Sequence, residues 1–263
     1  MTMKTTAEYP VVDAHVHLPT FDGLRSLQEK RIRLLQDLKE DGVDRCILIS
    51  DSELESSIGS MEECVGLFDA DENVRVVAGI SPLIGFDAQL ARLSGYLADG
   101  KVCGIKLFPG HERFYLSDPA LEPVWRLAER YGVPVLFHSG WENSGFASPG
   151  IVRAAAETHP SLRLVCCHCF YPDLWECLQM TDLPHLLFDL SSVADDPTRM
   201  EELIPAVSEL IRAVPDRVLF GSDYASCERA PHLRMMEQLE LSAEERRKVL
   251  SDNALSLYFR ENS

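Results

Sequence analysis

Short apolar runs alternate with longer amphipathic stretches along the chain, at a period of roughly 30 residues that matches a strand–helix unit. The apolar runs are rich in valine, isoleucine and leucine. They predict eight strands, at residues 11–17, 45–50, 74–80, 102–108, 133–138, 162–168, 185–190 and 217–223. Strands that alternate with helices form parallel sheets, and eight such units close into a barrel. The pattern therefore predicts an α/β protein with the (β/α)8 TIM-barrel fold.

The stretches between the apolar runs carry helix signals. Residues 24–40 repeat leucine at helical spacing and precede Gly42, a residue type that commonly follows a helix. Further helices are predicted between Asp87 and Gly100 and at residues 122–130, 242–249 and 254–259, the last two beyond the eighth strand. No linker or low-complexity segment interrupts the chain. Residues 1–263 are therefore expected to form a single domain with extra C-terminal helices.

Composition and charge narrow the classes of function. The 263 residues suit one barrel of typical size, about 250 residues, and 46% of them are hydrophobic and 25% charged. The net charge of −17 argues against nucleic-acid binding, which requires a basic face. There is no apolar run long enough for a membrane span and no secretory signal at the N-terminus. These features predict a cytoplasmic protein that binds neither nucleic acid nor membranes.

Eight cysteines are present, and three of them surround His168 at positions 166, 167 and 169. Such a cluster invites interpretation as a structural zinc site. No CxxC pair accompanies it, however, and consecutive strand residues point to opposite faces, so the four side chains cannot all reach one ion. We expect the cysteines to be reduced and mostly to fill the core.

Reactive side chains collect where the predicted strands end, which is the end at which parallel barrels carry their active sites. His15 and His17 are two residues apart, so strand alternation places both imidazoles on the inward face. Asp13 is expected on that face too, one layer deeper, where it would orient a ligand. His138 ends the fifth strand and Asp223 the eighth. Three imidazoles and one carboxylate suit zinc and leave room for water.

Two more residues fall at strand ends. Lys106 lies near the end of the fourth strand, and His168 ends the sixth. If its amine is carboxylated, Lys106 would bridge two ions; if not, it would attract an anionic group of the substrate. His111, in the loop after the fourth strand, is the one other histidine expected near these residues.

The sequence resembles the amidohydrolase superfamily, in the amidohydrolase-related branch that includes aminocarboxymuconate-semialdehyde decarboxylase and several small hydrolases and lactonases. The resemblance spans the chain from the first strand to the closing helices. Its motifs are VDAHVH at residues 12–17, GIKLFP at 104–109, VLFHSG at 135–140, CHC at 167–169, RVLFGSDY at 217–224, and Asn253-Ala254. The first and last strand motifs are the most specific.

The resemblance implies a role for each of these residues. His15, His17 and His138 would bind the metal, with Asp223 as a fourth ligand or as a base beside it. His168 would lie next to the metal-bound water or the substrate. The implied cofactor is Zn²⁺, with one ion most readily accommodated and two if Lys106 bridges; manganese or another divalent ion is the alternative.

Hydrolysis of a small-molecule amide, ester or lactone is the preferred function. A bound ion would lower the pKa of water to about 7 and polarise the scissile carbonyl. Asp223 would take the proton of that water, and His168 would stabilise the oxyanion or orient the nucleophile. The alternative is non-oxidative decarboxylation of an unsaturated or aromatic carboxylic acid at the same metal, because both reactions use the same residues. A barrel that only binds a small molecule is expected if the ligands do not assemble.

The loops after the strands are expected to set substrate specificity. Trp141 follows the ligand His138 and is a candidate substrate contact. Arg113 matches the geometry of a carboxylate, although an exposed loop arginine paired with an acid is an equal alternative. Phe170 would line the pocket or pack against it. The expected partner is a small molecule, and no sequence feature decides whether the chain forms a homo-oligomer.

Overall fold

The structure is a computed structural model that describes residues 9–52, 56–141 and 144–259. Eight strands form one sheet in chain order, and every neighbouring pair is parallel. The strands are β1 (Val12–Val16), β2 (Arg45–Ile49), β3 (Val74–Gly79), β4 (Gly104–Leu107), β5 (Val135–His138), β6 (Leu164–Cys167), β7 (Leu186–Asp189) and β8 (Val218–Leu219). Backbone hydrogen bonds join β1 to the segment around β8, from Ala14 N to Phe220 O at 2.8 Å and from Asp223 N to His15 O at 2.9 Å. The predicted TIM barrel is confirmed.

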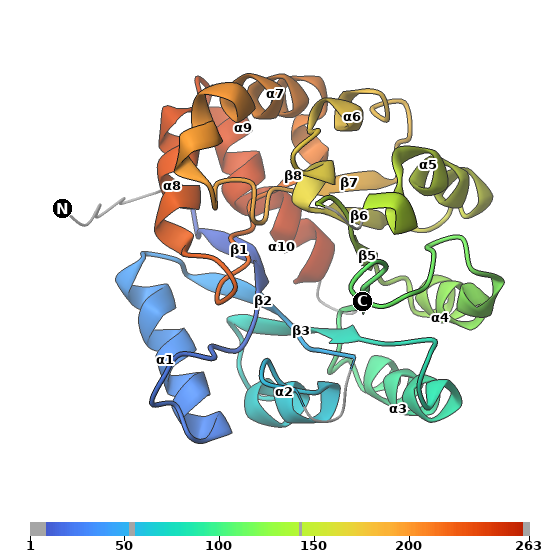
Figure 1. The fold of residues 1–263 in the computed structure, drawn as a ribbon. Helices are drawn as coiled ribbons and strands as arrows, with labels where there is room; N and C mark the ends of the chain where they lie inside the picture. The colour runs from blue at the N-terminus through green and yellow to red at the C-terminus, as the bar shows by residue number, and fades with distance from the viewer. Residues whose placement is uncertain (1–8, 53–55, 142–143, 260–263) are drawn as a thin grey trace.

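Helices surround the ring of strands, and α10 (Asn253–Tyr258) lies across its centre (Figure 1). The others are α1 (Leu27–Glu40), α2 (Met61–Phe68), α3 (Phe86–Ala98), α4 (Glu122–Tyr131), α5 (Pro149–Thr158), α6 (Trp175–Leu178), α7 (Met200–Ala213), α8 (Arg229–Gln238) and α9 (Ala243–Arg247). α9 and α10 are the predicted extra helices, joined by the π-helical turn Lys248–Asp252. In the part of the chain that the structure describes, no helix is both long and apolar enough to cross a membrane.

The helices begin where the sequence offers capping residues. In α1, Ser26 Oγ accepts a hydrogen bond from Glu29 N at 3.2 Å, and the Glu29 carboxylate accepts one from Ser26 N at 2.8 Å. This reciprocal pair satisfies two backbone donors that the first turn leaves without partners. Equivalent capping boxes start α2 and α9. The apolar faces of the helices then pack on the outer face of the strands, in the larger of two buried clusters.

The inside of the barrel holds a second apolar cluster. It contains inward-facing residues of the strands, among them Ile47, Val77 and Val165, together with Ala254 and Leu257 of α10. α10 therefore packs against the interior of the barrel as well as extending the chain. All eight cysteines are free, and six of them are buried.

A β-bulge in β1 changes which side chains face inward. Asp13 pairs with Cys46 and Val16 with Leu48, so β1 carries one more residue than β2 between these two pairs. Val12 and Ala14 face the interior cluster, and the extra residue lets His15 face inward as well. Asp13 instead forms a 2.8 Å ion pair with Arg229 of α8. The prediction that Asp13 shares the inward face of His15 is therefore wrong, because the bulge breaks the alternation, although Asp13 Oδ1 accepts a 3.3 Å hydrogen bond from His15 N.

Candidate active site

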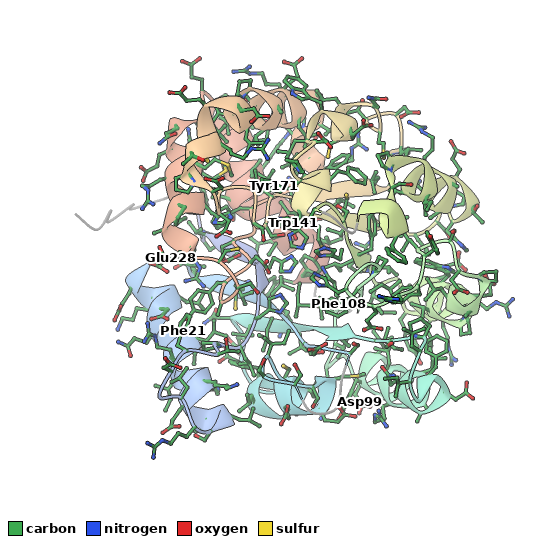
Figure 2. All side chains as sticks on the ribbon, viewed as in Figure 1. Phe21, Asp99, Phe108, Trp141, Tyr171 and Glu228 are labelled. Atoms are coloured by element: carbon green, nitrogen blue, oxygen red, sulfur yellow. The ribbon has the colours of Figure 1, made fainter. Side chains whose placement is uncertain are left out.

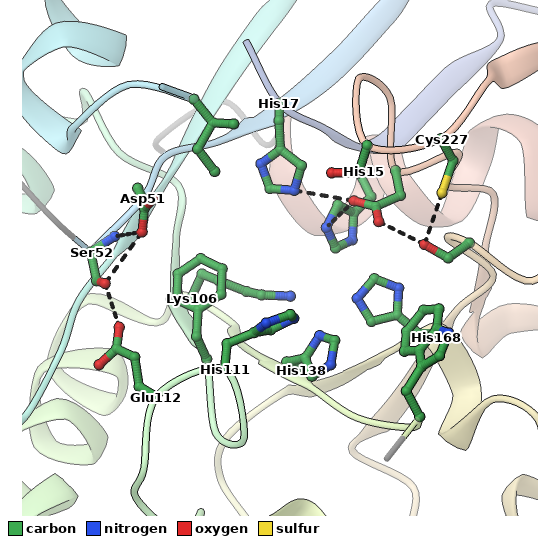
Figure 3. A pocket seen from close by; sticks show the side chains of 16 residues that line it. His15, His17, Asp51, Ser52, Lys106, His111, Glu112, His138, His168 and Cys227 are labelled. Carbon is green, nitrogen blue, oxygen red and sulfur yellow. Dashed lines mark hydrogen bonds and ion pairs between the residues drawn. The ribbon is translucent and has the colours of Figure 1, made fainter. Parts of the chain in front are cut away.

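A pocket of about 620 Å³ opens at the carboxyl ends of the strands. This volume is in the usual range for a small-molecule site, roughly 300–1,000 Å³. Trp141 and Phe108 lie near the centre of the ring of strands, whereas Asp99 lies at the outer edge (Figure 2). The pocket is lined by His15, His17, Asp51, Ser52, Ile58, Lys106, Phe108, His111, Glu112, His138, Trp141, His168, Ser192, Asp223, Ser226 and Cys227 (Figure 3).

Three side chains converge at one end of this pocket. His17 Nε2 lies 3.1 Å from Asp223 Oδ1, and His15 Nε2 lies 3.4 Å from the same oxygen. The three residues are buried, and one ligand atom from each lies within 4.8 Å of the other two. Figure 3 shows both imidazoles directed at the carboxylate. This is the nitrogen and oxygen donor set that zinc and similar divalent ions take.

The Nδ1 atom of each imidazole already has a hydrogen-bond partner. His15 Nδ1 lies 2.6 Å from Asp189 Oδ2, and His17 Nδ1 lies 2.9 Å from the carbonyl oxygen of Ile49. Both partners accept hydrogen bonds, so each Nδ1 carries the proton and each Nε2 presents a lone pair unless the ring is charged. A carboxylate partner or carbonyl partner on the far nitrogen is typical of metal-ligating histidines. Two lone pairs and a carboxylate oxygen that face one another fit a bound divalent cation.

The charge states agree with this arrangement. Burial lowers the pKa of His15 more than the neighbouring Asp189 raises it, so the neutral imidazole is favoured. Burial alone would raise the pKa of Asp223. The contact with His17 and the nearby His15 and His168 outweigh that effect and hold the pKa of the Asp223 carboxyl well below its usual range. The site thus presents an ionised carboxylate to a neutral imidazole.

His168 and His138 line the neighbouring wall. The His168 ring centroid lies 5.1 Å from that of His15 and 4.8 Å from that of His138. His168 Nδ1 is held by the Ser191 carbonyl oxygen at 3.1 Å and by the Ser191 hydroxyl at 2.9 Å. Burial, together with Lys106 and His111, lowers the pKa of His138 to about 2. Burial also holds the pKa of His168 well below its usual value, so both rings are neutral at ordinary pH.

Lys106 brings a buried amine to the same pocket. Its side chain is 1% exposed, and its Nζ has no hydrogen-bond partner among the described residues. Cys167 forms a second close group with His15 and Asp189. In this group His15 Nδ1 and Asp189 Oδ2 are already joined by a 2.6 Å hydrogen bond, and burial raises the pKa of the Cys167 thiol to about 12. We therefore interpret this second group as the surroundings of His15 and not as another metal site.

Backbone conformation is unusual at this end of the barrel. The non-glycine residues with positive φ, among those described, are Trp141, His168, Cys169, Phe170, Ser192 and Asp223, with φ between 51° and 66°. All of them follow β5, β6, β7 or β8 at the carboxyl end. Such conformations cost about 1–3 kcal/mol each and cluster at functional sites. Here they turn His168 and Asp223 into the pocket immediately after their strands end.

The sequence profile of the amidohydrolase family, Amidohydro_2, matches residues 12–260. The match covers every strand of the barrel and every residue of the His15, His17 and Asp223 group. This chain belongs to the amidohydrolase family. The expectation of an enzyme in the amidohydrolase superfamily is confirmed by this match. A search of curated protein sequences found no match.

Solved structures share the fold of this amidohydrolase at low sequence identity. An uncharacterised TIM-barrel protein from Bordetella bronchiseptica is 17% identical, with a TM-score of 0.76 over 94% of this chain and 98% of its own. 5-Carboxyvanillate decarboxylase LigW2 from Novosphingobium aromaticivorans, with bound manganese, is 14% identical (TM-score 0.68; 99% and 100% covered). 4-Oxalomesaconate hydratase LigJ from Rhodopseudomonas palustris is 16% identical (TM-score 0.67; 94% and 95% covered).

The structure of the amidohydrolase gathers most of the predicted site residues around one pocket. The lining includes His15, His17, Lys106, His138, Trp141, His168 and Asp223. His138 lies on the wall outside the close His15, His17 and Asp223 group. Phe170 is 3% exposed and packs in the outer core, so it does not line the pocket. Arg113 is exposed and is not among the lining residues either.

Sequence reasoning missed several residues of this site. Asp189 holds His15, and Ser192 donates a 2.6 Å hydrogen bond to Asp223 Oδ2. Asp189 ends β7, so the rule that pointed to His138 and Asp223 would also have found it. Asp51 and Glu112 lie in loops after β2 and β4 and carry no comparable signal.

Proposed function

We propose that this amidohydrolase hydrolyses a small-molecule amide, ester or lactone at one divalent ion held by His15, His17 and Asp223, with His138 of the neighbouring wall as the fourth ligand. The observation that carries the proposal is that two imidazole Nε2 atoms lie close to one carboxylate oxygen. The Nδ1 atom of each imidazole already has a hydrogen-bond partner. A divalent ion at this position supplies a Lewis acid and lowers the pKa of a bound water. Zinc suits the donor set, and manganese is the alternative.

The protein's own residues take distinct parts in the reaction. Asp223, an ionised and buried carboxylate, accepts the proton of the attacking water and passes it to the leaving group. His168 orients that water, because its Nδ1–H donates to the Ser191 carbonyl and leaves Nε2 as an acceptor. The Lys106 amine, a donor without a hydrogen-bond partner among the described residues, stabilises the developing oxyanion. A donor of this kind is worth about 3 kcal/mol.

Decarboxylation of an unsaturated or aromatic carboxylic acid is the second candidate. Two observations support this candidate. The fold is similar to that of 5-carboxyvanillate decarboxylase, and the buried Lys106 amine would bind a substrate carboxylate. In that reaction His168 or Asp223 would take a proton from water and pass it to the carbon that loses carbon dioxide.

Elemental analysis of the purified protein, followed by a substrate panel, tests the proposal. We expect about one zinc or manganese ion per chain and hydrolysis of at least one lactone, amide or ester. Full metal content in the double variant His15→Ala, His17→Ala would contradict the ligand set. Release of carbon dioxide from an aryl or muconate-type acid, without hydrolysis of any other compound, would replace the hydrolase by the lyase.

A further inference from the structure

The pocket wall opposite His168 is acidic. Figure 3 shows Asp51, Ser52 and Glu112 on one side of the cavity and His168 and Cys227 on the other. Asp51 and Ser52 follow β2, whereas Glu112 follows β4. The amidohydrolase mechanism proposed above uses none of these three side chains. They nevertheless face the same cavity as the metal-binding group.

Hydrogen bonds fix this acidic wall in place. The hydroxyls of Ser52 and Ser81 donate to the two carboxylate oxygens of Glu112, which ties together the loops after β2, β3 and β4. Asp51 Oδ1 accepts from Ser52 N at 2.7 Å, and Asp51 Oδ2 accepts from Ser56 Oγ at 2.5 Å. No lysine, arginine or histidine among the described residues forms an ion pair with Asp51. Because an ionised carboxylate has about four acceptor positions, Asp51 keeps capacity for a ligand donor.

The complementary charge lies between the acidic wall and His168 (Figure 3). Lys106 is the one lysine or arginine among the described residues that line the pocket, and its buried Nζ has no hydrogen-bond partner. A buried amine without an acceptor is costly, so a ligand oxygen at this position is expected. His111 lies near both Lys106 and Asp51. Burial lowers its pKa, Lys106 lowers it further, and Asp223 and Asp51 oppose that change.

We propose that the substrate is bipolar, with an anionic or strongly accepting oxygen group at Lys106 and an ammonium or similar multiple-donor group at Asp51. Ile58, Phe108 and Trp141 supply apolar surface in the same pocket, which suits a hydrocarbon segment between the two ends. A dicarboxylate fits poorly, because its second carboxylate would meet the Asp51 carboxylate with no arginine among the described lining residues. The proposal rests on the hydrolase site but concerns recognition and not chemistry.

Isothermal titration of the purified protein, at its native metal content, tests this recognition. The probes are 4-aminobutanoate, 6-aminohexanoate and 8-aminooctanoate, each beside the monocarboxylate and the dicarboxylate of equal length. We expect the best amino acid to bind at least about tenfold more tightly than its two counterparts, as a charge-assisted hydrogen bond provides. Asp51→Asn should reduce this preference to about threefold or less while leaving monocarboxylate binding unchanged. Lys106→Met should weaken the binding of every carboxylate probe.

Glu209→Gln, on the exposed side of α7, is the matched control and should change no dissociation constant. A dicarboxylate that binds as tightly as the amino acid overturns the proposal, as does an unchanged preference in Asp51→Asn or a lack of binding by all nine probes. Because no probe is hydrolysed, the result is independent of the proposed reaction. If the probes bind as expected but no panel compound is hydrolysed, the hydrolase function fails and the bipolar recognition stands.

Discussion

Replacing Asp189 with asparagine should weaken metal binding although it removes no metal ligand. Asp189 Oδ2 lies 2.6 Å from His15 Nδ1, and Asp189 Oδ1 accepts from Ser191 N at 2.9 Å. The asparagine would keep its oxygen on the Ser191 amide and direct its NH₂ at His15. Because that NH₂ only donates, His15 Nδ1 would have to accept, and the ring proton would move to Nε2. Nε2 is the atom that faces Asp223.

The size of the effect follows from burial. An imidazole with its proton on Nε2 has no lone pair for the ion, so binding requires the less favourable tautomer or a rotated asparagine. Loss of an outer partner of this kind typically lowers metal affinity about 10- to 100-fold, or roughly 1.4–2.8 kcal/mol. We expect the upper half of that range, because His15 and Asp189 are each 1% exposed and water cannot replace the lost acceptor.

Competition with a chromophoric chelator measures the apparent dissociation constants of zinc and manganese. Asp182→Asn is the matched control, because Asp182 is an exposed acid paired with Arg153 at 2.9 Å. The metal affinity of this variant should equal that of the parent protein. Circular dichroism verifies that both variants are folded. A folded Asp189→Asn protein whose dissociation constants stay within about twofold of the parent would refute the tautomer argument.

Three other substitutions probe the surroundings of the site. Gly221→Ala should lower both the melting temperature and the metal affinity, because a Cβ there would overlap the Asp189 carboxylate; thermal unfolding and chelator competition measure the two effects. Arg229→Met should lower the free energy of unfolding by about 3–5 kcal/mol in urea titrations, because Asp13 would stay buried without its cation. Lys106→Met should leave about one ion per chain in elemental analysis and reduce kcat for a hydrolysed substrate by about 10²-fold.

Matched controls separate these effects from general damage. Gly95→Ala, in α3, places its Cβ in open space and should be neutral or stabilising by up to about 1 kcal/mol. Arg126→Met removes an exposed pair with Glu122 and should cost less than about 0.5 kcal/mol. A similar loss in Arg229→Met would show that its buried pair contributes little. A fall from two ions to one in Lys106→Met would instead make Lys106 a bridging ligand.

The sequence by itself determined the barrel and most of the residues that surround its pocket. Eight apolar runs separated by amphipathic stretches can bury their faces together as a ring of parallel strands inside helices. Once that ring exists, its carboxyl ends must converge. His15, His138, His168 and Asp223 therefore meet at one pocket although they are far apart in the chain. The alternation of side chains along a strand and the position of each residue at a strand end were sufficient to predict that these residues surround the pocket.

Only the tertiary structure decided how the side chains are directed and supported. The bulge in β1 turns Asp13 outward to Arg229. The bulge depends on how β1 pairs with β2, and the alternation of residues along β1 does not predict that pairing. Asp189 comes to hold His15 across 174 positions of sequence. The acidic wall forms because serine hydroxyls join three loops at Glu112. Each of these contacts depends on where distant segments lie, so no periodic pattern along the chain could encode it.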